Sequence, residues 1–96
     1  MNNKHIVQYI RRHNHRVGVI IATPMIDNPA LIGIGWSLAN RNAGDAFNPK
    51  LGLEIATTRA VKGSGVDLPP SIEADIEKMR DRAKRYFKGN AGILIA

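Results

Sequence analysis

Basic side chains gather early in the chain around a short polar segment with the chemistry of a turn. Arg11 and Arg12 precede His13-Asn14-His15, and Arg16 follows it, while no acidic residue occurs among the first 26 residues. Guanidinium groups hold phosphate oxygens by charge and by paired hydrogen bonds. The pattern therefore predicts a phosphate-binding hairpin that enters a nucleic-acid groove or grips a backbone. The alternative is a charged hairpin edge that prevents pairing with another sheet.

A second group of cations, Arg41 and Lys50, is expected near the start of a helix. Asn48-Pro49 is a strong helix start, with Asn as the N-cap and Pro in the first turn. A helix N-terminus can bind an anion, although the Asn48 side chain can satisfy it instead. The predicted phosphate-binding set is Lys4, Arg11, Arg12, His13, His15, Arg16, Arg41 and Lys50.

Other chemistries find little support in the residue types. His5, His13 and His15 match no standard ligand spacing, and the chain contains no Cys, so we expect neither a metal nor another cofactor. Ser37 with Asp45 and a histidine is the one combination that could form a triad, but Ser37 lacks the nucleophile-elbow pattern. We therefore expect a binding protein and not an enzyme.

The only Trp and one of the two Phe residues lie where a strand is expected to give way to a helix. Such a corner can present aromatic side chains to a protein partner. Trp36 and Phe47 are thus predicted to contact a partner, with a half-buried core position as the alternative for Trp36.

Three strands are expected within residues 5–38. Residues 6–12 fit a strand or one face of a helix, and the turn that follows favours the strand. Residues 17–23 form a nearly continuous β-branched run, typical of a central strand buried on both faces. In the third strand, residues 31–38, Gly33 and Gly35 leave one face without side chains, which favours close packing of a helix and leaves a bulge as the alternative.

Two helices are expected to follow, over about residues 49–61 and 68–88. The first has a stripe at Leu51, Ile55 and Thr58, with Leu53, Ala56 and Ala60 beside it. The second carries Ile72, Ile76, Met79, Ala83 and then Tyr86 or Phe87 at helical spacing.

These elements predict one α+β domain over residues 1–96. We expect two layers, with a three-stranded antiparallel meander and both helices on one face of it. The tail, residues 92–96, contains Ile93-Leu94-Ile95, which either adds a short C-terminal edge strand or docks on a second copy. A chain of 96 residues buries a small core, so a homodimer would add stability.

Composition bounds the location and the partners. The net charge of +6 favours polyanions, although a charge of this size also serves solubility. The apolar runs are too short for a membrane span, and no signal-peptide pattern is present. We expect a protein of the cytoplasm with no membrane contact.

Several motifs together resemble a group of small bacteriophage-encoded proteins of uncharacterised function. They are Gly35-Trp36-Ser37-Leu38, the Asp45-Ala46-Phe47 loop, and a helix that starts with Gly52-Leu53-Glu54-Ile55-Ala56 and continues to Arg59-Ala60. The similarity covers roughly residues 6–61 and includes the preceding hairpin; Ala39, where a Cys is common, and an inserted Ala43-Gly44 depart from it.

The resemblance implies a phage accessory protein acting in a bacterial cell by contact and not by catalysis. The favoured function is binding of nucleic acid or a nucleotide through the basic hairpin. The alternative is an inhibitor or modulator of a host protein, for example of a defence system, acting through a protein–protein interface.

Overall fold

The fold is built around one four-stranded sheet. The computed structural model describes residues 5–39, 47–63, 68–87 and 92–95. The strands, in the order in which they lie in the sheet, are β1 (Ile6–Arg12), β2 (His15–Pro24), β3 (Leu31–Leu38) and β4 (Gly92–Ile95). The first three form an antiparallel meander, as predicted, and the α+β class is confirmed. The apolar tail forms an edge strand, β4, parallel to the first half of β3.

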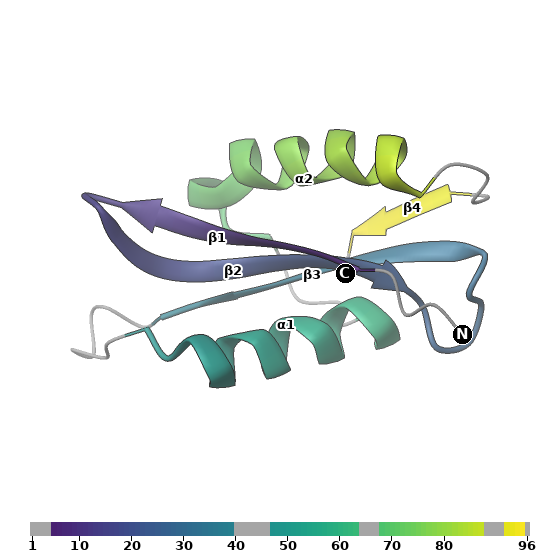
Figure 1. Ribbon diagram of the computed structural model, residues 1–96, viewed down its shortest axis with the longest axis horizontal. Helices are drawn as coiled ribbons and strands as arrows, with labels where there is room; N and C mark the ends of the chain where they lie inside the picture. Colours follow the sequence, from purple (N-terminus) through teal and green to yellow (C-terminus); the bar gives the residue numbers. More distant parts are fainter. Residues whose placement is uncertain (1–4, 40–46, 64–67, 88–91, 96) are drawn as a thin grey trace.

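The helices cover opposite faces of this sheet. Figure 1 shows α1 (Pro49–Lys62) below the sheet, while the short 3-10 helix η2 (Pro70–Ile72) and α2 (Glu73–Tyr86) lie above it. The prediction that both helices share one face is wrong. Its physical reason lies in β2, where every residue from Val17 to Ala22 is buried, so that apolar side chains on both faces need a cover.

The α2 face holds the large apolar side chains. The stripe expected on the second helix is buried against β1, β2 and β3, and Phe87 takes the last position while Tyr86 is exposed. This core consists of Ile6, Ile10, Val17, Ile20, Ala22, Ile32, Ile34, Trp36, Ile72, Ile76, Met79, Ala83 and Phe87.

The α1 face is packed much more closely. A methyl group at Gly33 or Gly35 would collide with the backbone carbonyls of Ala60 and Ala56 in α1, so the glycines of β3 make room for a helix backbone. This confirms the close helix packing predicted from the two glycines.

No helix within the described ranges is long and apolar enough to cross a bilayer.

Close packing also decides which side of α1 is buried. Gly52, Ala56 and Ala60 face the sheet, whereas Leu51 is 52% exposed and Ile55 is 36% exposed. The predicted inward stripe through Leu51, Ile55 and Thr58 is therefore wrong. Hydrophobicity favours burial of the larger residues, but a backbone this near the sheet accepts only small ones.

Candidate polyanion-binding hairpin

A two-residue turn joins β1 to β2. Arg12 and His15 form the last cross-strand pair, and the two residues between them have positive φ, 51° at His13 and 66° at Asn14. Positive φ at both central positions is the backbone of a type I′ turn, whose twist matches that of the strands it joins. The predicted turn is confirmed, with Asn14 in a conformation that Asn tolerates well.

A bulge beneath the turn sets the direction of the basic side chains. Ile10 pairs with Gly18, but the next residue, Arg11, pairs with Arg16, so Val17 has no partner on β1. Cross-strand partners share a face of the ribbon. Because neighbouring residues alternate, Arg11 and Arg16 lie on one face, and Arg12 lies with its partner His15 on the other.

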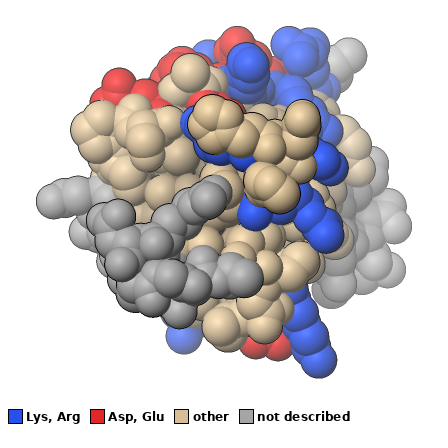
Figure 2. Space-filling view, turned by 90° about the vertical axis from the view of Figure 1, so that its left-hand side faces the viewer, with Lys and Arg blue, Asp and Glu red and all other residues tan. Residues whose placement is uncertain are grey.

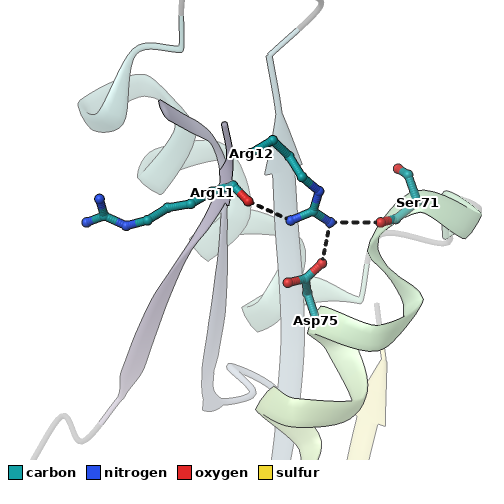
Figure 3. Close-up of polar contacts among 4 residues, drawn as sticks. All are labelled: Arg11, Arg12, Ser71 and Asp75. Carbon is teal, nitrogen blue, oxygen red and sulfur yellow. Dashed lines mark hydrogen bonds and ion pairs between the residues drawn. The ribbon is translucent and has the colours of Figure 1, made fainter. Parts of the chain in front are cut away.

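Arg12 holds the hairpin against the start of α2. Its Nη2 lies 2.8 Å from Asp75 Oδ2 and donates to the Ser71 carbonyl at 3.0 Å. Its Nη1 donates to the Arg11 carbonyl at 2.8 Å, as Figure 3 shows. Much of the donor capacity of this guanidinium is used within the protein, although the side chain remains 44% exposed. Arg12 is thus first a positioning residue for the hairpin.

Arg11 has the opposite orientation. In Figure 3 its side chain extends away from the cluster around Arg12, with the guanidinium far from Asp75. Arg11 is exposed, and no ion pair with it occurs among the described residues. Its full hydrogen-bonding fork is therefore available to an external anion.

Arg16 is held by an aromatic side chain. Its guanidinium carbon lies 5.0 Å from the centre of the Tyr9 ring, and the Tyr9 and Phe47 rings meet edge to face with centroids 6.3 Å apart. The cation–π contact orients Arg16 without consuming its hydrogen-bond donors. Phe47, predicted to contact a partner, is partly buried against the smaller core on the α1 face, where its ring also covers Gly52. This α1-side core consists of Val19, Ile21, Ala56 and Ala60.

The first turn of α1 supplies one further cation. Asn48 Oδ1 accepts from the Leu51 amide at 3.2 Å, and Pro49 occupies the first turn, which confirms the predicted helix start. The cap thus uses one of the amides that could have bound an anion. Lys50 is exposed, and Figure 1 places this helix end on the same side of the molecule as the hairpin tip. Lys4 and Arg41 lie outside the described residues.

Charge at this end is unbalanced. All six residues from Arg11 to Arg16 are exposed, and none is acidic. Figure 2 looks onto this end and shows Lys and Arg atoms running through the view, with Asp and Glu atoms near its upper and lower margins. Within the described ranges, Arg12–Asp75 and Arg80–Glu77 are the two ion pairs found. Arg11, Arg16 and Lys50 therefore form a cationic surface without carboxylate partners in the described structure.

Trp36 lies in the core, which agrees with the alternative given for it and not with the predicted partner contact. It is 7% exposed, with its ring in the α2-side core and the Arg59 guanidinium 4.7 Å from the ring centre. Arg59 Nη1 also donates to the Trp36 carbonyl at 2.8 Å, while the indole Nε1 has no acceptor among the described residues. Trp36 offers little surface to a partner. The role of Arg59 in covering it carried no signal in the sequence pattern.

A small hollow lies beside the Arg12 cluster. It encloses about 200 Å³ between the hairpin, the end of β3 and η2, with a mainly apolar lining from Ile10, Val17, Leu38 and Ile72. Ser37, the one candidate nucleophile, is buried, and no group of three potential metal ligands occurs within the described ranges. The described part of this end therefore exposes cationic side chains beside a mainly apolar hollow.

Comparisons with known proteins add no family to this description. No protein-family model matches the chain, and neither a curated protein nor a solved structure matches it. The resemblance to small phage proteins therefore stays a prediction from its motifs. The function has to be argued from the geometry of the hairpin itself.

Proposed function

We propose that this protein is a non-catalytic accessory protein of phage type that binds phosphate-bearing ligands, nucleic acid or a nucleotide, through its basic hairpin. The observation that carries the proposal is the pair Arg11 and Arg16. They are exposed cross-strand neighbours without a carboxylate partner in the described structure.

The surroundings of this pair favour anion binding. Arg12 fixes the hairpin to α2 through Asp75, and Tyr9 orients Arg16, so less side-chain and backbone freedom is lost when a ligand binds. Both guanidinium groups can form paired hydrogen bonds with phosphate oxygens. Lys50 and the exposed histidines of the turn extend the surface on which a phosphate chain can lie.

The direct test removes the two free arginines. Each cation that no longer neutralises a phosphate should lower the slope of log affinity against log salt by about 0.9 for a DNA duplex. We expect Arg11→Ala/Arg16→Ala to weaken binding to labelled DNA by about tenfold or more and to lower that slope by about 1.8. Fluorescence anisotropy across a salt series measures both quantities.

A matched control separates a local site from net charge. Lys84→Ala/Arg85→Ala also removes two positive charges, from the last turn of α2, which Figure 1 shows at the end of the molecule away from the hairpin tip. This control should bind nearly as well as the unaltered protein. An equal loss in both double variants would show that overall charge, and not the hairpin, governs binding.

One observation favours a second function, the binding of a host protein. Leu51 and Ile55 lie one turn apart on the outer side of α1 and are exposed. Exposed apolar side chains at this spacing are a common anchor for a protein partner. If this function holds, Leu51→Ser/Ile55→Ser abolishes capture of a stoichiometric protein from nuclease-treated bacterial lysate, whereas Arg11→Ala/Arg16→Ala leaves it intact.

We also propose a homodimer, which the small core of a 96-residue chain supports. The apolar tail, one of its two arguments, pairs with β3 of the same chain. Light scattering coupled to size-exclusion chromatography measures the mass directly. A dimer mass that falls to that of a monomer in Leu51→Ser/Ile55→Ser would place the interface on α1.

A further inference from the structure

The β1–β2 hairpin is an arm as well as a charged edge. In Figure 1 its tip extends beyond the first turns of both α1 and α2, along the long direction of a molecule measuring 41 × 24 × 21 Å. The exposed stretch from Arg11 to Arg16 is the end of this arm. The turn residues His13 and Asn14 lie beyond the Arg12 contact with α2, so they are the part of the ribbon that reaches furthest toward a ligand.

Both faces of the ribbon carry arginine. Arg11 and Arg16 lie on one face, and Arg12 lies on the other with nearly half of its side chain exposed. His13 and Asn14 occupy the tip between them. Their side chains offer donors and acceptors of the kind that base edges present. The arm thus carries two unpaired arginines on one face, an arginine paired with Asp75 on the other, and polar side chains at its end.

The arm is held in one direction. The bulge at Val17 fixes its twist, and the Arg12–Asp75 pair fastens one face to α2, while the contact of Arg16 with Tyr9 lies within the ribbon and orients Arg16 on the other face. A ribbon restrained in this way inserts with little loss of conformational freedom. A loosely tethered loop with the same residues would bind phosphate without selecting the shape around it.

We infer that this arm enters the major groove of B-form DNA, with His13 and Asn14 toward the base edges and Arg11 and Arg16 toward a phosphate wall. The inference rests on the proposed function and names its ligand. The groove is about 12 Å wide and admits a two-stranded ribbon, whose strands lie about 4.8 Å apart. The minor groove of undeformed DNA is only about 6 Å wide, so it admits such a ribbon only where the duplex is bent or opened, and the major groove of A-form RNA is deep and narrow.

The test compares two duplexes of equal charge and different groove shape, and adds a single DNA strand, which has a lower charge and no groove. The unaltered protein is titrated with a DNA duplex of roughly 20 bp, two helical turns, with the RNA duplex of the same sequence, and with the single DNA strand. We expect the DNA duplex to bind at least about tenfold more tightly than the RNA duplex. Guanine N7 lies in the major groove, so bound protein should also protect it from methylation by dimethyl sulfate.

A variant at the tip probes the base edges without altering charge. Asn14→Gly keeps a residue that accepts positive φ and removes the side chain, so the turn should be retained. We expect its affinity for the DNA duplex to fall about threefold to tenfold, with binding to the single strand unchanged. Circular dichroism of the variant verifies the fold.

The outcomes distinguish the groove inference from the proposed function. Preference for the DNA duplex together with N7 protection supports the inference. Equal affinity for the three nucleic acids, or binding without N7 protection, overturns the groove inference, while the proposed function stands if Arg11→Ala/Arg16→Ala still weakens binding. Absence of binding to all three overturns the groove inference and the nucleic-acid form of the proposed function together.

Discussion

The two faces of the sheet are packed against their helices in opposite ways. On the α2 face, long apolar side chains such as Ile76 and Met79 fill the space between helix and sheet. On the α1 face, Gly33 and Gly35 of β3 remove that space, and the backbone of α1 rests near that of the sheet. One face is thus stabilised by side-chain volume, and the other depends on its absence. The difference shows that residue size, and not only hydrophobicity, decides which side of a helix is buried.

The largest expected effect is the loss of volume on the α2 face. Ile76 is 1% exposed and packs within the larger core. Ile76→Ala should lower the free energy of unfolding by about 3 to 4 kcal/mol, through lost burial and the cavity left behind. Urea denaturation followed by far-ultraviolet circular dichroism measures this change. A loss below about 1 kcal/mol would mean that α2 is not packed as described.

The next effect has the reverse chemistry, because adding one methyl group destabilises the α1 face. Gly35→Ala places a Cβ against the carbonyl of Ala56, and the contact is with backbone that cannot rotate away. We expect a loss of about 2 to 3 kcal/mol in the same denaturation experiment. Gly63→Ala is no suitable control, since Gly63 has a φ of 71°. Ala74→Gly, at an exposed site in α2, changes one methyl group without a clash and should cost only the difference in helix propensity, about 1 kcal/mol.

The smallest effects concern two contacts of the hairpin, one that fastens it to α2 and one that lies within it. Arg12→Ala breaks the pair with Asp75 and should cost about 1 kcal/mol or less, because the pair is partly exposed. Arg16→Ala removes the contact with Tyr9 and should cost about 0.5 kcal/mol. Arg11→Ala removes a side chain that makes neither contact, so it serves as the control and should leave stability unchanged. Equal losses in all three would contradict the division of roles among these arginines.

Much of the fold could be predicted from local sequence features. Gly33 and Gly35 indicated the close approach of a helix, and Asn48-Pro49 marked its first turn, because a missing side chain and a capping group act over a few residues. The continuous apolar run of β2 also contained the clue that both faces are covered. A central strand buried on both faces requires a cover on each face of the sheet, and the prediction of both helices on one face did not take this into account.

The candidate site was predictable in composition but not in arrangement. Nothing in the residues near Arg12 indicates Asp75, which lies 63 positions further along the chain, so its positioning role emerges only in three dimensions. The bulge at Val17 likewise depends on a pairing register and not on a turn residue. Leu51 and Ile55 were expected inside because their periodicity fits a helix face equally well whichever side meets the sheet.

The position of Trp36 gives the protein an optical reporter of its own. As the only tryptophan, it supplies nearly all of the emission excited at long wavelength, and its ring lies in the α2-side core while the guanidinium of Arg59, from α1, stacks on it. Separation of either helix from the sheet changes what surrounds the indole. A single fluorescence trace therefore follows both layers at once, and Arg59→Ala would leave a signal that follows the α2 side alone.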